Sequence, residues 1–553
     1  MLYTQINSGR KKSPRVQHIK TRLAFIWIVK LLVNFTAFGR KLCGLEAETC
    51  RSFQCIVQSK GYNMITWTLW CGLMFVLWIY FLWSRRRFYL LTLKIPGPIG
   101  YPFMGMAHKL IHREDILNEF GIYLRKHGPT IMSWLGPIPF VIASDPQVVQ
   151  DILTSPHCVN KGIIYRAVDD GMGVGLFSLK DPRWSVHRKL LNPAFSHKVL
   201  ISFLPIFNKE TGQLLKQFDS LPGNGELNLI PLLQSFTMGI TTQTTMGCDV
   251  KSEANFKSIV ESYHCCLETI TDMCISPWLH SKWIRQLLGR EVNYHRSKTE
   301  IRGFLRKLIH KRLADETEDS IVSKDKNIFL HVTTDLFRRG VFDLTNVEDE
   351  SNQVVFGAFE TTAKTVYYVL MLLAMFPQYQ ERVFEEIKSL FPDSGDFEVT
   401  YEDTQQMVYL DLAINESMRV ISPIPLVSRQ TSADLTLSNG IVIPKGVQIM
   451  IDIFHMHRSK KLWGPEAETF NPDNFLAHKA RGEQHPYAFI PFTKGIRNCI
   501  GWKYALISVK VILAKLLRNY SYKTSFKFED LYFVEDVTMK LKTVPKLQVQ
   551  KRK

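Results

Sequence analysis

The sequence lacks a regular disulfide pattern. Its ten cysteines show no even spacing, and Cys265 and Cys266 are adjacent instead of forming a C-x-x-C pair. A disulfide framework and a zinc site are therefore both disfavoured, and a reducing compartment is favoured. The chain also lacks a helix-turn-helix signature, zinc-finger spacing and a ribonucleoprotein-type strand motif. Its formal charge of +18 is thus better matched to an anionic membrane surface or an acidic protein partner than to nucleic acid.

The sequence also has few signals of a domain boundary. No Ser/Gly-rich linker, low-complexity run or internal repeat divides the chain after about Pro96. Hydrophobic residues make up 46% of the sequence and charged residues 22%, which is ordinary for a globular protein with a sizeable core. Although 553 residues could hold more than one domain, we expect one large catalytic domain over residues 101–553.

One segment has no charge at all. Met64–Trp83 is a stretch of twenty residues without a charge, long enough to cross a hydrocarbon core as a helix. Three arginines, Arg85–Arg87, follow at once and place the rest of the chain in the cytosol by the positive-inside rule. A buried core helix is the weaker interpretation, because no polar stripe is present. No small-residue cleavage site is present, so we expect a retained single-pass anchor over residues 64–83 and a basic, proline-rich hinge over residues 84–100.

The leader before this segment fits poorly with it. Eleven basic residues precede residue 61, against only Glu46 and Glu48. A basic leader would compete with the arginine triplet over orientation. The apolar stretch Leu23–Phe38 is short and interrupted by Lys30, so a second span is not expected. We expect that Met64 is the native initiator or that residues 1–63 form a disordered leader.

A lone cysteine near the C-terminus lies in a glycine-bracketed loop, Pro491–Gly501 (PFTKGIRNCIG). Gly495 lets the backbone turn, and Gly501 allows close approach of the chain or of a macrocycle. Apolar residues recur at helical spacing from Ile500, which places Cys499 at a helix N-terminus, where free amides stabilise a thiolate. Such a thiolate can be the axial ligand of a haem iron. The alternative is a buried free cysteine before an amphipathic helix.

This loop, with its pattern Phe-x-x-Gly-x-Arg-x-Cys-x-Gly, resembles the haem-binding loop of the cytochrome P-450 family. The resemblance runs from about Pro96 to the C-terminus and is closest to the microsomal branch that contains fatty-acid ω-hydroxylases and many insect enzymes. It implies a mainly α fold with small β-sheets and a haem b cofactor. The loop residues implied to hold that cofactor are Phe492, Gly495, Arg497 and the iron ligand Cys499.

Three further residues resemble haem-contacting positions of the family. Trp184 and Arg188 match its Trp-x-x-x-Arg pattern, and their i, i+4 spacing puts both on one helix face. Arg429 resembles another propionate-binding arginine. Each would be read as a surface residue without the cysteine loop. The resemblance implies that these three and Arg497 donate to the two haem propionates.

The segment Phe356–Thr362 (FGAFETT) resembles the oxygen-activation motif of the family. Threonine and carboxylate side chains can divert helix hydrogen bonds and hold a water. The resemblance implies that Thr361 and Glu360 are catalytic, with Glu360 relaying protons toward dioxygen. A polar patch on an amphipathic helix is the alternative. Gly357 stands where ω-hydroxylases often carry a glutamate that forms an ester to the haem, so that covalent link is not expected.

A structural network is also implied. Glu416 and Arg419 are spaced i, i+3 on a helix expected over Val408–Ile421, although such pairs are usually solvent-exposed. In the family this Glu-x-x-Arg pair is buried with a residue of a Pro-x-x-Phe segment. Here Asn474 takes that place and can hydrogen-bond without supplying a charge.

Several local elements are predicted from pattern alone. Two strands bracket a turn at residues 136–139, a long helix runs from about Asn346 to Phe376, and Asn439-Gly440 indicates a hairpin. Residues 200–340 are predicted to be mainly helical.

The resemblance, together with the anchor, implies a haem-thiolate monooxygenase in the endoplasmic reticulum membrane with its catalytic domain facing the cytosol. The resemblance implies electrons from NADPH through NADPH–cytochrome P-450 reductase, with cytochrome b5 as an optional donor, and a small lipophilic substrate. Basic residues fit the acidic face of a reductase: Arg183, Lys494, Arg497 and Lys503. The alternatives are a haem-thiolate isomerase or dehydratase that needs no dioxygen, disfavoured by the Glu360-Thr361 pair, and a non-enzymatic haem-binding protein.

Overall fold

The computed structural model describes residues 53–552 with short gaps at 99, 102–103, 111, 224, 252, 254–255, 315–327 and 482–484. The chain divides into two compact units, Met1–Arg86 and Arg87–Lys553. Most of the leader expected over residues 1–63 lies outside the described residues, which begin at Phe53.

The described part of the first unit is helix α2 (Phe53–Ser84), which contains the whole segment 64–83. The helix begins before Met64, so residues 53–63 are helical. Among the straight helices of the described residues, only its segment Trp67–Ser84 is long and apolar enough to cross a membrane. None of that segment is buried.

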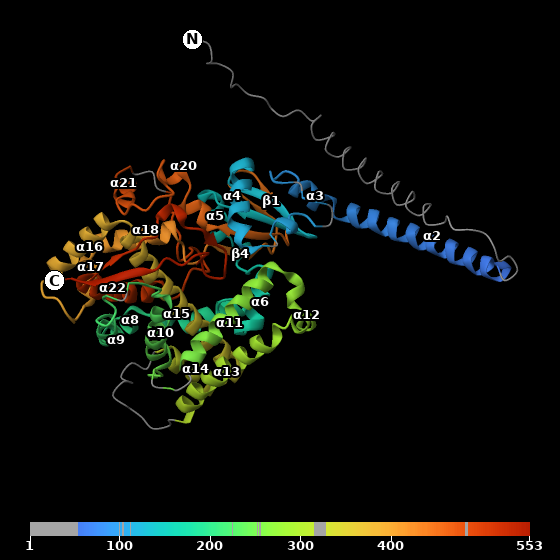
Figure 1. Ribbon diagram of the computed structural model, residues 1–553. Coiled ribbons are helices and arrows are strands. Elements are labelled where there is room, and N and C mark those ends of the chain that lie inside the picture. The colour runs from blue at the N-terminus through green and yellow to red at the C-terminus, as the bar shows by residue number, and fades with distance from the viewer. Residues whose placement is uncertain are drawn as a thin grey trace, which may run out of the picture. The chain divides into compact units, whose positions relative to one another are not determined.

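The second unit is built mainly of helices (Figure 1). In chain order they are α3 (Arg86–Thr92), which starts at the boundary, α4 (Ile116–His127), α5 (Pro146–Thr154), α6 (Arg166–Met172), α7 (Arg183–Leu191), α8 (His197–Ser202), α9 (Leu204–Phe218), α10 (Ile230–Thr241), α11 (Phe256–Ile275), α12 (Lys282–Leu287), α13 (Glu291–Ala314), α14 (Phe329–Arg338), α15 (Leu344–Met375), α16 (Pro377–Leu390), α17 (Tyr401–Gln406), α18 (Val408–Val420), α19 (Ile453–His457), α20 (Lys460–Trp463), α21 (Asn474–Arg481) and α22 (Trp502–Asn519).

Four small sheets are formed by the described residues of this unit. The largest has the order β1-β2-β7-β4, from β1 (Thr130–Leu135), β2 (Ile138–Ala143), β7 (Gln448–Asp452) and β4 (Leu426–Gln430). The second has the order β3-β11-β8, from β3 (Glu226–Leu227), β11 (Leu547–Lys551) and β8 (Tyr520–Lys523). Two hairpins pair β5 (Leu435–Thr436) with β6 (Val442–Ile443) and β9 (Phe533–Val534) with β10 (Lys540–Leu541).

Local sequence signals explain the elements that frame the site. Helix α15 starts with a capping box, in which Asp343 accepts from the Asn346 amide at 2.6 Å, and it ends just before Pro377. The hairpins predicted around residues 136–139 and at Asn439-Gly440 are present, and Gly440 has the positive φ of 79° that its turn requires. The predicted fold class, mainly helical with small sheets, is confirmed.

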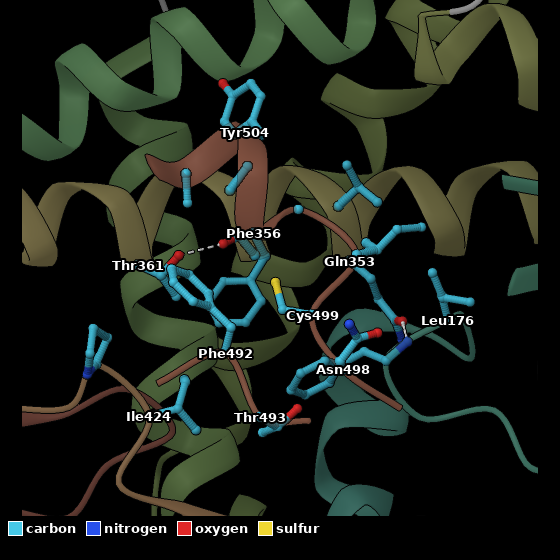
Figure 2. Close-up of a pocket in the computed structure, with 18 of the residues that line it drawn as sticks. Leu176, Gln353, Phe356, Thr361, Ile424, Phe492, Thr493, Asn498, Cys499 and Tyr504 are labelled. Atoms are coloured by element: carbon cyan, nitrogen blue, oxygen red, sulfur yellow. Dashed lines mark hydrogen bonds between the residues drawn. The ribbon is translucent and has the colours of Figure 1, made fainter. Parts of the chain in front are cut away.

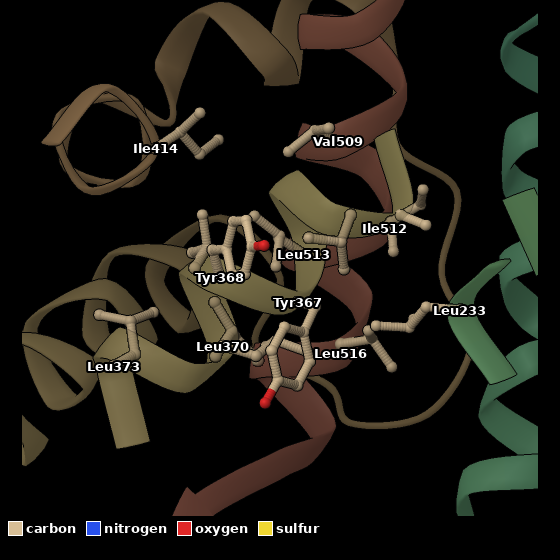
Figure 3. Close-up of a cluster of buried hydrophobic side chains, with 14 of the residues drawn as sticks. Leu233, Tyr367, Tyr368, Leu370, Leu373, Ile414, Val509, Ile512, Leu513 and Leu516 are labelled. Atoms are coloured by element: carbon tan, nitrogen blue, oxygen red, sulfur yellow. The ribbon is translucent and has the colours of Figure 1, made fainter. Parts of the chain in front are cut away.

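The main core surrounds the C-terminal half of α15. Figure 3 shows Tyr367, Tyr368 and Leu370 of α15 facing Leu513 and Leu516 of α22, all of them fully buried or nearly so. Helices α10 and α18 also pack on α15. Tight apolar packing on several sides fixes α15 as a rigid support for the residues along its cavity-facing side.

Candidate active site

A cavity of about 250 Å³ lies between α15 and the loop Pro491–Gly501. Its lining is mostly apolar, and Figure 2 shows the Cys499 side chain directed into it, with Phe356 and Phe492 beside the sulfur. Helix α15 contributes four of the lining residues: Gly357, Ala358, Thr361 and Thr365. The segment after α18 contributes three more: Pro423, Ile424 and Val427. The lone cysteine therefore faces the motif on the long helix, although about 140 residues separate them in sequence.

Backbone constraints hold the cysteine loop in one shape. Gly495 has a φ of 73°, and a Cβ at this position would overlap the carbonyl oxygen of Leu153. Among the described residues other than glycine, only Thr493 has a positive φ, at 56°. The Cys499 amide donates to the Phe492 carbonyl at 3.0 Å. The thiol is thus presented from a strained, hydrogen-bonded loop and not from a flexible surface turn.

The Cys499 side chain has exposed surface, but that surface opens onto the cavity. Burial raises the pKa of the Cys499 thiol, and this outweighs the opposing effects of the Gly501 amide and of the cations Arg188 and Lys161. Helix α22 begins at Trp502, three residues after Cys499, so the helix N-terminus gives less thiolate stabilisation than expected. A thiol that binds a metal ion is nonetheless deprotonated.

Arg497 lies at the edge of the cavity. Its guanidinium stacks on the Trp184 ring at 4.4 Å and donates to the carbonyls of Val159 at 3.0 Å and Leu176 at 3.3 Å, and also to that of Leu179. Arg497 and Trp184 both line the cavity and both are buried. Burial, followed by repulsion from Arg429, lowers the pKa of Arg497 to about 9.

Arg188 and Arg429 are placed differently. Arg188 lines the cavity and donates to the backbone carbonyl and the side-chain oxygen of Asn498, at 3.1 and 3.0 Å. Arg429 is 1% exposed and lies behind the cavity wall, outside its lining residues. Its Nη1 donates to the Ser428 carbonyl at 2.9 Å, whereas its buried Nη2 has no partner among the described residues. An unpaired buried guanidinium nitrogen is costly and indicates a missing acceptor.

Thr361 and Glu360 point into different spaces. Thr361 lines the main cavity, and its hydroxyl donates to the Gly357 carbonyl at 2.7 Å (Figure 2). Glu360 is buried on another side of α15 and lines a second cavity of about 160 Å³. There its carboxylate pairs with Lys364 at 3.0 Å and accepts from Gln234 at 2.8 Å. The sequence motif suggested that Glu360 and Thr361 act in the same cavity, but the structure places their side chains in two different cavities.

The ionisation of Glu360 follows from these neighbours. Burial would raise the pKa of Glu360, but Lys364 and His264 outweigh it, so the pKa of this carboxyl lies below its ordinary value. Glu360 is therefore a carboxylate near neutral pH, and it can accept a proton from the second cavity.

The Glu416–Arg419 pair is fully buried, with Nε to Oε2 at 2.7 Å. Arg419 also donates to the carbonyls of His457 and Thr469, at 2.8 and 2.9 Å. Asn474 donates to Glu416 at 3.0 Å, so an amide completes the network. None of these residues lines the cavity, so the network does not contact a group bound there.

The cavity residues fit a flat, dianionic iron macrocycle. A Cβ on Gly357 would meet no protein atom within 4 Å, and one on Gly501 would meet only Phe195 at 3.8 Å, so both glycines face open space. Of the two partners expected to approach Gly501, the chain or a macrocycle, the described chain does not come close, which leaves this space to a macrocycle. No cluster of three His, Cys, Asp or Glu residues suits a metal ion within the described part of the chain. Cys499 would be the protein ligand, and haem supplies the other ligands itself.

Lys161 and Tyr165 are among the cavity residues that no sequence pattern singled out. Both lie between α5 and α6, in a stretch with no motif, so only the fold brings them to the cavity. Gln353 of α15 was also missed. It lines the cavity and accepts from the Phe177 amide at 2.7 Å, which fixes the loop that follows α6.

Comparison with known proteins agrees with this geometry. The family model Cytochrome P450 matches residues 95–543. Probable cytochrome P450 313a4 of Drosophila melanogaster is 73% identical over 494 residues, covering 88% of this chain and 100% of the relative. Probable cytochrome P450 313a2 of the same organism is 44% identical over 86% of this chain and 97% of that protein. Cytochrome P450 4c3, also from Drosophila melanogaster, is 30% identical over 89% and 96%. The resemblance inferred from the motifs, including its insect branch, is confirmed. The chain belongs to the cytochrome P450 family of haem-thiolate monooxygenases.

Proposed function

We propose that the protein is a membrane-anchored monooxygenase that inserts one oxygen atom from dioxygen into a small lipophilic substrate. The observation that carries this proposal is the placement of Cys499 and Thr361 in one apolar cavity. Haem b bound there supplies a redox-active iron at which dioxygen is activated. The apolar walls bind the substrate and exclude bulk water, which strengthens the polar interactions inside the site.

The protein residues would divide the binding of haem among them. Cys499 supplies the axial thiolate, and Phe492 and Gly495 shape the loop that presents it. Cationic and indole donors for the two propionates stand at the cavity edge or directly behind it: Trp184, Arg188, Arg429 and Arg497. The unpaired Nη2 of Arg429 would gain an acceptor. Glu416, Arg419 and Asn474 stabilise the fold near the loop and take no part in the chemistry.

Protons would come from the other side of α15. Glu360 would accept them in the second cavity, and the Thr361 hydroxyl would hold a water in the main cavity. Because the two residues are adjacent in sequence, a local rearrangement of the helix hydrogen bonds would connect the two cavities. The Thr361 hydroxyl is already diverted to the Gly357 carbonyl.

Removing either member of this pair should separate electron use from product formation. Glu360→Gln and Thr361→Val should each lower product formation by about 10²-fold, the lower end of what positioned proton transfer contributes. NADPH consumption should continue, with peroxide as its product. Thr365→Val, one turn along the same helix and also at the cavity, is the matched control. Equal losses of NADPH oxidation and product in the two variants would contradict a role in proton delivery.

The remaining parts of the chain are assigned by the same proposal. Residues 64–83 anchor the protein in the endoplasmic reticulum membrane, residues 84–100 form a hinge, and residues 101–553 form the catalytic domain on the cytosolic side. Residues 1–63 are a basic leader that precedes the anchor. Electrons come from NADPH through a reductase whose acidic face meets Lys494 and Lys503, with cytochrome b5 as an optional donor.

The proposed function is tested by turnover. The full chain in lipid vesicles, with a P450 reductase and a panel of fatty acids, terpenoids and steroids, should consume NADPH and incorporate labelled dioxygen into one product. A product formed without reductase or dioxygen would instead support an isomerase or dehydratase. Haem binding without any substrate-dependent NADPH use across the panel would support a carrier or sensor.

A further inference from the structure

We propose that Lys364 is a positioning residue that holds Glu360 as a carboxylate on the wall of the second cavity. The inference rests on the proposed function, in which Glu360 accepts protons in that cavity. Lys364 lies two residues beyond the segment Phe356–Thr362, so no motif of the sequence includes it. It lines the second cavity and not the main one, so it would act on the reaction only through Glu360.

Lys364 and Glu360 form a buried ion pair one helical turn apart on α15. The Nζ atom of Lys364 lies 3.0 Å from Oε1 of Glu360, and the two residues are only 8% and 1% exposed. A lysine four residues after a glutamate lies on the same face of a helix, which brings the two side chains together. Because little water reaches the carboxyl group of Glu360, its charge depends on the cation beside it.

The other side of the ammonium group is held by Thr538, in the loop between β9 and β10. Lys364 Nζ donates to the Thr538 hydroxyl at 2.6 Å and to the Thr538 carbonyl at 3.5 Å. The same hydroxyl donates to Glu360 at 3.4 Å. An ammonium group has three protons, so Glu360 and the two oxygens of Thr538 accept all of them. Lys364 is therefore fixed at Glu360 and is not available to a ligand of the cavity.

The remaining neighbours of Glu360 make Lys364 the main source of its charge. Gln234 of α10 donates to the second carboxylate oxygen at 2.8 Å but carries no charge. Burial raises the pKa of Glu360, but Lys364 and, less strongly, His264 of α11 outweigh it. Without Lys364, burial would raise this pKa above its ordinary value, so Glu360 would hold a proton near neutral pH. The other charged side chains that line the second cavity are Glu268 on α11, Asp536 in the loop and Lys540 on β10.

The ion pair defines the state of Glu360 between turnovers. As a carboxylate, Glu360 takes a proton from water in the second cavity and forms an O–H bond. It then passes this proton toward the water at Thr361 and returns to the carboxylate form. A carboxyl group that is already protonated at rest cannot take up that proton. Stability alone does not require the pair, because apolar replacements of buried ion pairs are often as stable.

The experiment compares Lys364→Met, Lys364→Arg, Thr538→Val and the double variant Glu360→Gln/Lys364→Met in the full-length holoenzyme. The matched control is Lys540→Met, because this lysine also lines the second cavity but pairs with Glu268 at 3.4 Å. The first readout is the infrared C=O band of protonated carboxyl groups, followed as the pH is raised through neutrality. This readout needs no turnover. The second readout is product formed per NADPH over the same pH range, with the compound of the panel that turns over fastest.

Lys364→Met should gain a carboxylic acid band at neutral pH, beyond those of the wild type, that disappears as the pH rises. Thr538→Val should gain a weaker band of the same kind. Lys364→Arg, Lys540→Met and the double variant should resemble the wild type in this region of the spectrum. Product per NADPH in Lys364→Met should fall about 10-fold at neutral pH, less than in Glu360→Gln, because part of Glu360 stays ionised. It should recover as the pH rises, because Glu360 then loses its proton.

Two infrared results would overturn the proposal. Without an additional band in Lys364→Met, Glu360 would be ionised independently of the lysine, and a band that persists in the double variant would belong to another carboxyl group. The predicted band with a pH profile of product per NADPH like that of the wild type would overturn it in favour of a purely structural lysine. If the wild type formed no product from any compound of the panel, the proposed function would fail. The infrared comparison would still decide whether Lys364 holds Glu360 ionised.

Discussion

Cys499→Ser is expected to abolish monooxygenase turnover while leaving the apoprotein folded. The substitution replaces one atom at a position whose side chain meets the cavity and not the packed core. A serine hydroxyl keeps the volume but is a poor ligand for iron, and it lacks the electron donation by which a thiolate favours cleavage of the oxygen–oxygen bond. We expect product formation to fall by more than about 10³-fold, as when a group that acts at the reacting centre is removed.

The same substitution at a distant cysteine provides the control. Cys265 is partly buried on α11 and does not line the cavity, so Cys265→Ser should retain turnover. Measuring product per mole of bound haem separates loss of chemistry from loss of cofactor. Substantial haem-normalised turnover in Cys499→Ser would show that another residue binds the iron.

Arg419→Met is expected to destabilise the catalytic unit by about 3–5 kcal/mol, the cost of breaking a buried ion pair from one side. Glu416 would be left as a buried charge, with only Asn474 and the Asn471 amide as donors. The carbonyls of His457 and Thr469 would lose their donor as well. The effect should appear as a lower urea midpoint and as low recovery of haem-containing protein at 37 °C.

An exposed ion pair nearby provides the control for that measurement of stability. Arg382 pairs with Asp473 at 2.6 Å, but both side chains are substantially solvent-exposed. Arg382→Met should therefore cost less than about 1 kcal/mol. A shift in Arg419→Met no larger than that in Arg382→Met would contradict the view that the buried network holds this region together.

Local patterns predicted the parts of the site whose function depends on neighbouring residues in sequence. The cysteine loop, the Glu-x-x-Arg spacing and the turn at Asn439-Gly440 each fit within a dozen residues, so the sequence shows them directly. The long helix was also predicted well, because its apolar periodicity and the following Pro377 are strong local signals.

Long-range placement could not be predicted in the same way. Lys161 reaches the cavity only because the chain folds back after α5, and no periodicity marks it. The separation of the Glu360 and Thr361 side chains could have been predicted from the sequence, because adjacent residues on an α-helix point about 100° apart. Gly357 and Thr361, four residues apart, share the cavity side for the same reason. The motif therefore contains residues that lie on two different faces of the helix.

The start of α22 shows how a small shift in an element changes a chemical expectation. Periodicity from Ile500 suggested that Cys499 lies directly at the helix N-terminus, but the helix begins at Trp502. The Gly501 amide, at the N-cap of α22, lowers the pKa of the thiol, but by less than burial raises it. A thiolate at this position is therefore owed mainly to the iron it would bind.

The central claim is that the Cys499 thiolate binds a haem iron in this cavity. The reduced–carbon monoxide difference spectrum of the full-length holoprotein tests it most directly. We predict the red-shifted Soret band that a thiolate ligand produces, and its loss in Cys499→Ser with Cys265→Ser unchanged. A carbon monoxide complex without that band in the wild type, or with the same band in Cys499→Ser, would contradict the account.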